Sequence, residues 1–173
     1  SASQSNDTIA WYENDGSENF TAHVITTSAD AAASVYAADL DGDDDMDVLS
    51  ASFNDDTIAW YENDGSENFT THAITTSTDG ASSVYAADVD GDGDLDVLSA
   101  SREDDTIAWH ENDGSENFTT HPITTSADEV ISVYAADMDG DGDMDALSAS
   151  HDSTIAWYEN DGSENFTAHP ITT

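Results

Sequence analysis

The sequence predicts an all-β fold built from one repeated four-stranded unit, and three observations predict it. The segment Thr-Ile-Ala-Trp begins at Thr8, Thr57, Thr106 and Thr154, so one unit recurs at spacings of 49, 49 and 48 residues. Short segments rich in Val, Ile, Thr, Tyr, Trp and Phe alternate with Gly, Asp, Asn and Ser clusters, which is the pattern of strands and turns. No stretch carries apolar residues at helical spacing.

The third copy of the unit contains the four expected strands in order. An acidic loop separates the first strand from the second, and a short acidic turn separates the second from the third. The turn Asn112-Asp113-Gly114 contains residues that tolerate positive φ, so we expect it to close a hairpin between the third and fourth strands. The four expected strands are residues 83–87, 96–101, 106–111 and 118–125.

Four antiparallel strands in roughly 40 to 50 residues match one blade of a β-propeller, in which neighbouring blades pack face to face. Strand alternation places Ile9 and Trp11 on one face and Ala10 and Tyr12 on the other. We expect the tryptophans to fill the space between blades and the alanines to allow close approach. The chain then holds about 3.5 blades, as one repeat domain or part of a larger array: a half blade of third and fourth strands at 1–27, and blades at 28–76, 77–125 and 126–173.

The charge of the chain excludes several classes of partner. It has 39 acidic residues and a single basic residue, Arg102, for a formal net charge of -38. Nucleic acid binding requires clustered Lys or Arg, so we expect no nucleic acid partner. No apolar run approaches the length of a membrane span, so we expect no membrane insertion. Cysteine is absent, so disulfides cannot reinforce the fold, and bound metal could take that role instead.

A nine-residue block, Asp-x-Asp-Gly-Asp-x-Asp-x-Asp, occurs three times, at 39–47, 88–96 and 137–145. Alternate residues of such a loop can face one hard cation, and Ca²⁺ takes roughly six to eight oxygen ligands. The sequence therefore predicts about three Ca²⁺ sites per chain. The candidate ligands are Asp39, Asp41, Asp43, Asp45 and Asp47; Asp88, Asp90, Asp92, Asp94 and Asp96; and Asp137, Asp139, Asp141, Asp143 and Asp145.

The run from Asp88 to Ala100, placed between two strands of a repeated unit, closely resembles the FG-GAP or VCBS repeat of integrin-α-like calcium-binding β-propellers. The resemblance covers essentially the whole chain, although the Phe-Gly and Gly-Ala-Pro landmarks are absent. It implies that loop positions 1, 3, 5 and 9 bind calcium through their side chains. It also implies that position 7, which is Asp45, Asp94 or Asp143, binds through its backbone carbonyl.

The first loop departs from the other two at one position. It has Asp44 where the others have Gly93 and Gly142. Because Asp tolerates a left-handed conformation less well than Gly, we expect the first site to be weaker or more strained.

The EF-hand is the competing calcium motif, and its loop needs a bidentate Glu at position 12. Position 12 is Ser50, Ser99 or Ser148 here, and strand-like residues follow, so the EF-hand is rejected. A merely solvated acidic turn is disfavoured by the threefold repetition. The ligand set predicts affinities of about 10⁻⁴ to 10⁻³ M, which are typical of structural sites.

A second repeated motif is the glycosylation sequon. Asn-Phe-Thr follows each expected hairpin tip, where an acceptor is exposed, and Asn-Asp-Thr occurs near the start. Two interpretations stay open, because the triplet is also explained by duplication of one ancestral unit. The candidate acceptors are Asn6, Asn19, Asn68, Asn117 and Asn165.

Catalysis finds no support in the sequence. The chain has no Cys nucleophile, no unique Ser-His-Asp grouping and no Gly-rich phosphate loop, so we expect no catalytic residues and no enzyme. One histidine recurs at the same position of each unit, which favours a structural role over a single active site. These histidines are His23, His72, His121 and His169. His110 replaces a tyrosine that the other copies keep, and His151 lies in a variable turn.

These observations favour a non-enzymatic extracellular or cell-surface protein with a structural or adhesive role. Open blade edges invite self-association, so copies of the chain are the first expected partner, in a dimeric ring of about seven blade equivalents or in a fibre. The alternative is a carbohydrate-binding, lectin-like propeller module whose partners are glycans or cell-surface proteins. The chain opens without Met, so we expect a processed form or a fragment.

Overall fold

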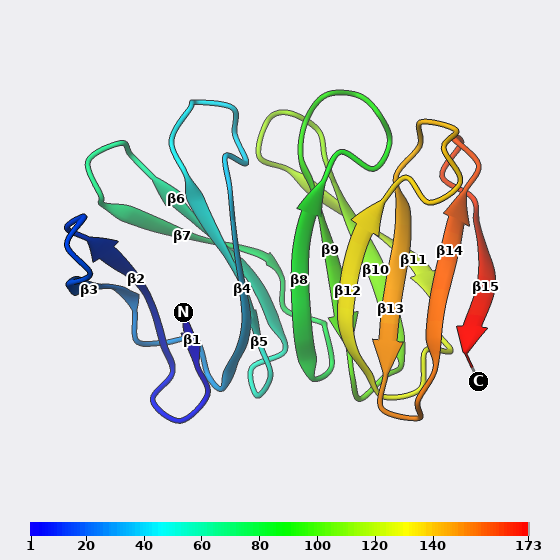
Figure 1. Cartoon of the computed structure of the whole chain (residues 1–173), viewed down its shortest axis with the longest axis horizontal. Coiled ribbons are helices and arrows are strands. Elements are labelled where there is room, and N and C mark those ends of the chain that lie inside the picture. Colours follow the sequence, from blue (N-terminus) through cyan, green and yellow to red (C-terminus); the bar gives the residue numbers. More distant parts are fainter. Residues whose placement is uncertain (173) are drawn as a thin grey trace.

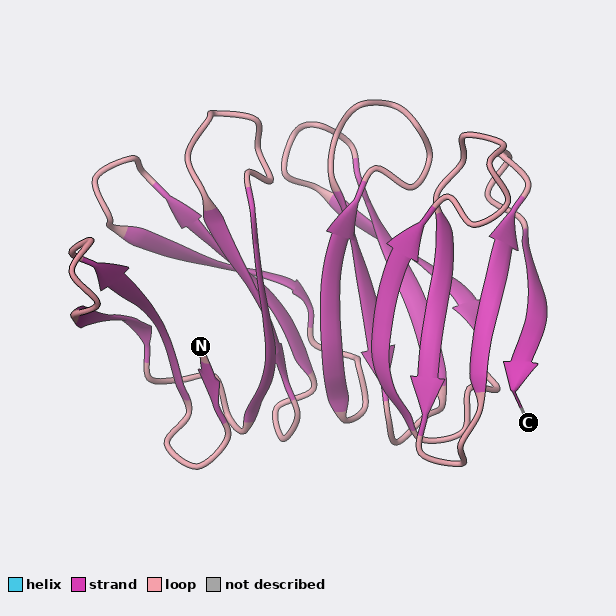
Figure 2. Cartoon of the chain, viewed as in Figure 1, coloured by secondary structure: helices cyan, strands magenta, loops and turns pink. Residues whose placement is uncertain are grey.

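The computed structural model describes residues 1–172, and these residues form fifteen strands in four antiparallel sheets. Figure 2 shows strands and loops alone across this part of the chain. The first sheet contains β1 (Ala2–Ser3), β2 (Thr8–Asn14) and β3 (Phe20–Thr26). The second contains β4 (Ala32–Ala38), β5 (Asp47–Ser52), β6 (Thr57–Asn63) and β7 (Phe69–Thr75). The third contains β8 (Ala81–Ala87), β9 (Asp96–Ser101), β10 (Thr106–Asn112) and β11 (Phe118–Thr124). The fourth contains β12 (Val130–Ala136), β13 (Asp145–Ser150), β14 (Ile155–Asn160) and β15 (Phe166–Thr172).

Every sheet keeps its strands in chain order, and the sheets follow one another across the molecule from the N-terminal to the C-terminal part (Figure 1). The first strands of the three full sheets, β4, β8 and β12, lie side by side. This arrangement confirms the predicted all-β fold of propeller-like blades. The division of the chain into domains at the predicted boundaries stays a prediction. Within the described residues, no helix is long and apolar enough to cross a membrane.

The predicted hairpins at Asn-Asp-Gly join the last two strands of each sheet. In the third sheet, Gly114 has the expected positive φ of 69°, and Glu116 also has a positive φ, 64°. The second left-handed residue was not expected, because Glu has no intrinsic preference for that region. The carboxylate of Asp113 accepts hydrogen bonds from the backbone N–H groups of Ser115 and Asn117 at 2.9 and 3.2 Å, which holds the backbone in this conformation.

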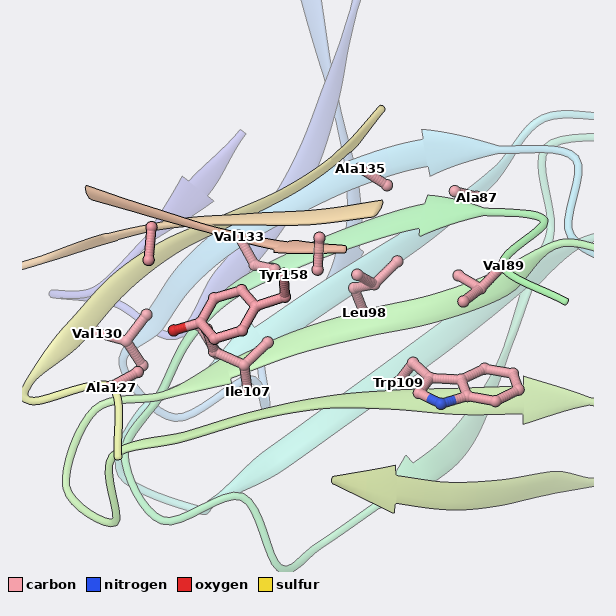
Figure 3. Packing of buried hydrophobic residues seen from close by; sticks show 13 residues of the cluster. Ala87, Val89, Leu98, Ile107, Trp109, Ala127, Val130, Val133, Ala135 and Tyr158 are labelled. Atoms are coloured by element: carbon pink, nitrogen blue, oxygen red, sulfur yellow. The ribbon is translucent and has the colours of Figure 1, made fainter. Parts of the chain in front are cut away.

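Apolar side chains fill the space between neighbouring sheets. Figure 3 shows Ile107 of the third sheet near Val133 and Tyr158 of the fourth, and Trp109 belongs to the same buried cluster. Alanines on the facing strands keep the sheets close. Trp60 and Trp109 are each 1% exposed, so the interpretation of these two residues as interblade packing is confirmed. Trp11 and Trp157, in the first and fourth sheets, are only partly buried.

The repeated histidine packs on the repeated tryptophan of the neighbouring strand. The rings of Trp109 and His121 stack with centroids 4.7 Å apart, and His121 Nε2 lies 2.8 Å from Glu111 Oε2. The same contact recurs in every sheet, with centroid distances of 4.2 to 4.7 Å. The histidine therefore joins an aromatic face to a carboxylate on the adjacent strand, which is a structural role.

Candidate metal centres

Each acidic block forms the loop between the first and second strands of a full sheet, and the backbone of the loop turns toward the carboxylates. In the second loop, Asp88 Oδ1 accepts from the N–H of Gly91 at 2.8 Å, and Asp88 Oδ2 accepts from the N–H of Gly93 at 3.2 Å. Asp90 Oδ1 accepts from the N–H of Asp92 at 3.1 Å. These local bonds hold the acidic side chains in one small loop despite their mutual repulsion.

The last aspartate of each block begins the second strand and lies inside the protein. Asp96 is 0% exposed, and its two oxygens accept from the N–H groups of Val89 and Asn112, both at 2.8 Å. Burial raises the pKa of Asp96 to about 7, although these two hydrogen bonds act in the opposite direction. Asp47 makes the same pair of bonds with Leu40 and Asn63, and Asp145 makes it with Met138 and Asn160.

Three carboxylates approach one another in each loop, with ligand oxygens that all lie within 4.8 Å. Calcium–oxygen bonds are about 2.3 to 2.6 Å long, so two ligands of one ion lie at most roughly 5 Å apart. Oxygen donors at this separation suit a hard divalent cation, so the residues fit a calcium ion. The clusters are Asp39, Asp41 and Asp43; Asp88, Asp90 and Asp96; and Asp137, Asp139 and Asp145.

The first loop differs from the other two in the membership of its cluster. Its cluster contains Asp43, at position 5 of the block, and does not contain Asp47, at position 9, whereas the other two clusters contain the aspartate at position 9. The backbone also differs, because Asp44 has a φ of 74° where Gly93 and Gly142 have φ values of 103° and 105°. Asp44 therefore occupies the left-handed region, as its position in the block predicts. The weaker affinity expected of this site stays a prediction.

The aspartate at position 7 of each loop directs its carboxylate toward a hairpin rather than into the cluster. The carboxylate of Asp94 lies directly over Gly114, where a Cβ atom would collide with it. This contact was not predictable from local sequence patterns, because Asp94 and Gly114 lie in different turns of the chain. Asp45 lies over Gly65, and Asp143 over Gly162, in the same way.

The asparagines of the five sequons are all exposed. In the hairpins, the side-chain amide also binds an aspartate: Asn117 Nδ2 donates to the two carboxylate oxygens of Asp113 at 3.2 and 3.0 Å. This bond is the first cause that lowers the pKa of Asp113 below its usual value. The repeated asparagine therefore helps to hold the hairpin, in addition to being a candidate acceptor.

His110 lies in a pocket of about 250 Å³ between the second and third sheets. His110 Nε2 is 3.0 Å from Ser99 Oγ, and Nδ1 is 2.9 Å from Thr120 Oγ1. Burial, followed by the charge of His121, lowers the pKa of His110 to about 4, so its imidazole is neutral at physiological pH. The second sheet has Tyr61 at this position. The lining is mostly hydroxyl-bearing: Thr75, Ser77, Thr78, Ser99, Ser101, Asp104, Thr106, Ala108, His110 and Thr120.

Comparisons with known proteins agree with this arrangement of sheets and loops. The family model described as the FG-GAP-like repeat matches residues 1–50, 42–99 and 88–148. A search of curated proteins found no match. Among solved structures, a lectin of Agrocybe aegerita is similar, with a TM-score of 0.63 and 18% identity over 95% of this chain and 47% of the lectin. The chain thus spans about half the length of that lectin, which is described as recognising non-reducing terminal N-acetylglucosamine.

Proposed function

Because this chain belongs to the FG-GAP-like repeat family, we propose that it is a calcium-binding, non-enzymatic repeat protein with a structural or adhesive role, outside the cell or on its surface. The observation that carries the proposal is the threefold cluster of aspartates, each in the same loop of successive sheets. The buried carboxylate of Asp96 adds support, because burial and then the charges of Asp90 and Asp92 raise its pKa, and a bound cation would offset both effects.

Bound calcium would hold together the chain segments at one end of each full sheet. The loop carboxylates at positions 1, 3, 5 and 9 and the position-7 carbonyl would hold the ion. Asp96 also accepts a hydrogen bond from the backbone of Asn112, which opens the hairpin of the same sheet. An ion in the acidic loop between β8 and β9 would therefore also stabilise the start of the hairpin between β10 and β11.

Calorimetric titration with CaCl₂ and thermal unfolding with and without a chelator test this proposal. We expect about three ions per chain, and each site should add about 2.7 kcal/mol when free calcium is 100 times its Kd. Asp96→Asn should remove one site, whereas Asp79→Asn, an exposed carboxylate outside the loops, should remove none. A melting temperature that chelation leaves unchanged would contradict the structural role of calcium.

Glycosylation forms part of the same proposal. It is supported by the exposure of Asn6, Asn19, Asn68, Asn117 and Asn165. Expression in a glycosylating host should give a protein that loses mass on enzymatic deglycosylation. Asn117→Gln should remove one glycan from this total, while Asn63→Gln, outside any sequon, should remove none. A secreted protein that carries no glycan would leave the asparagines with their hairpin role alone.

Self-association into a ring or fibre is proposed on the exposed apolar residues of the first and fourth sheets. Tyr12 and Val24 are 52% and 61% exposed in the first sheet, and Ile155 and Ile171 are 43% and 54% exposed in the fourth. The equivalent of Ile155 in the third sheet, Ile107, is fully buried against its neighbour. Electron microscopy and sedimentation in millimolar calcium should give rings or fibres, and a monomer at high concentration would count against assembly.

Carbohydrate binding is the second candidate function, and the hydroxyl-lined pocket beside His110 favours it. Hydroxyl and imidazole groups suit the hydrogen bonds of a neutral sugar. A glycan array probed with the chain and with His110→Tyr tests this function, because tyrosine, which the second sheet has at the equivalent position 61, is larger than histidine and would reduce the pocket. Binding that the variant loses would support a lectin, and an array without any binding would favour the structural role.

A further inference from the structure

Three tyrosines form a continuous row across the first strands of the full sheets. Tyr36 of β4, Tyr85 of β8 and Tyr134 of β12 occupy the same position in successive units. The ring centroids of Tyr36 and Tyr85 are 4.6 Å apart, and those of Tyr85 and Tyr134 are 4.3 Å apart. The planes are tilted by 50° and 46°. Each ring therefore touches the next, although 49 residues separate them along the chain.

The two rings of the Tyr85–Tyr134 pair differ in their exposure. Tyr85 is partly buried and packs on the core between the third and fourth sheets, whereas Tyr134 is 53% exposed. Burial, followed by the neighbouring hydroxyls of Tyr134 and Tyr36, raises the pKa of Tyr85 well above its usual value. Because the ring centroids of Tyr85 and Tyr134 are 4.3 Å apart, ring carbons of the two residues lie in contact.

We propose that Tyr85 and Tyr134 form the site of an oxidative dityrosine cross-link between the third and fourth sheets. The rings of Tyr85 and Tyr134 are closer together than those of Tyr36 and Tyr85. The exposed ring of Tyr134 is also accessible to an oxidant. The link would give a chain without cysteine a covalent tie between two sheets. The cross-link would form whether or not the acidic loops bind calcium.

Hydrogen peroxide would oxidise the two phenols, and a haem peroxidase would catalyse the reaction. Each phenol loses one electron and one proton to become a phenoxyl radical, whose spin density lies partly on the ortho carbons. The two ortho carbons join in a new C–C bond, and the ring hydrogens then return to the oxygens, so both rings are aromatic phenols again. The two electrons and two protons reduce one peroxide to two waters.

Treatment of the purified chain with peroxidase and limiting peroxide tests the proposal. We expect a monomeric product that has dityrosine fluorescence and has lost the mass of two hydrogen atoms. The chain has one basic residue, so digestion at acidic residues rather than with trypsin should release the linked peptides for mass spectrometry. The linked peptides should contain Tyr85 and Tyr134.

Tyr85→Phe should lower the intramolecular yield by tenfold or more, because Phe keeps the ring stack but cannot form the phenoxyl radical. Tyr12→Phe is the matched control, because Tyr12 is exposed and lies outside the row, and it should leave the yield unchanged. A link between Tyr36 and Tyr85 alone would overturn the assignment of the partner. An equal yield in the chain unfolded by urea, or links only between different chains, would overturn the proposal.

Discussion

The side-chain amide of Asn160 donates a hydrogen bond of 3.0 Å to the backbone carbonyl of Val89, so the hairpin of the fourth sheet is tied to the acidic loop of the third. The same amide donates to the carbonyl of Met144 in its own acidic loop at 3.3 Å. Asn112 makes the equivalent bond to the carbonyl of Leu40 in the preceding sheet. One buried asparagine in each of these hairpins therefore connects the acidic loops of two successive sheets.

Replacement of Asn160 by Ala should lower the free energy of unfolding by about 1 to 3 kcal/mol, because the buried carbonyl of Val89 loses its partner. Urea unfolding in calcium would measure the loss. Asn63→Ala is the control, because among the described residues the amide of Asn63 donates to the carbonyl of Met46 in its own sheet and to no neighbouring sheet. An equal loss in both variants would show that the bond between sheets contributes little.

Stability should depend on pH through His110. Its folded pKa of about 4 lies below the usual 6.5, so between these values the unfolded chain binds a proton that the folded chain does not. The contribution of His110 is then complete above pH 6.5 and falls by up to about 3 kcal/mol as the pH drops to 4. His110→Tyr should remove this part of the acid dependence, whereas His151→Gln, at an exposed position, should not.

Measurements of unfolding from pH 4 to pH 8 on the parent chain and both variants would check this dependence. All three proteins have the same carboxylates, so the difference between the curves of the parent and His110→Tyr reports on the histidine, while His151→Gln shows the effect of losing an exposed histidine that pairs with Glu129. Parallel curves for the parent and His110→Tyr would contradict the prediction.

Asp44→Gly should strengthen the first metal site. Asp44 has a φ of 74°, and a non-glycine residue in the left-handed region costs about 1 to 2 kcal/mol. Glycine relieves this cost, which we expect to outweigh the loss of one exposed, solvent-screened negative charge from the loop. Calcium titration should therefore show a tighter first site, and Gly93→Asp should weaken the second by a similar factor. Opposite changes would mean that the local charge of Asp44 favours the ion.

Trp109→Ala should destabilise the protein by about 3 to 5 kcal/mol, since it empties a fully buried contact between the third and fourth sheets. Trp11→Ala should cost clearly less, because Trp11 is only partly buried and borders an apolar pocket of about 270 Å³. Denaturant unfolding of the two variants gives the comparison. Equal losses would argue that stacking on histidine, which both tryptophans share, outweighs packing between sheets.

The strands and hairpins were predictable because they depend on local patterns. Asp96–Ser101 was predicted with the bounds that β9 has, and the acidic loops lie where their blocks predict. Residues in contact between sheets were not predictable in the same way. The tyrosine row that contains Tyr85 depends on the offset between neighbouring sheets. The contact of Asp94 with Gly114 depends on a hairpin that lies against the acidic loop. Strand alternation gives the face of a residue but not its partner across that face.

The second and third sheets present the side that carries Trp to the following sheet, which presents the side that carries Ala, as Trp60 and Ala86 do at one junction and Trp109 and Ala135 at the next. The two junctions between full sheets are therefore made from the same two surfaces. Recombination between near-identical gene segments can add or delete a whole unit, and the new junction repeats a contact that the protein already has. Array length can thus drift in a lineage while the packing at each junction stays the same.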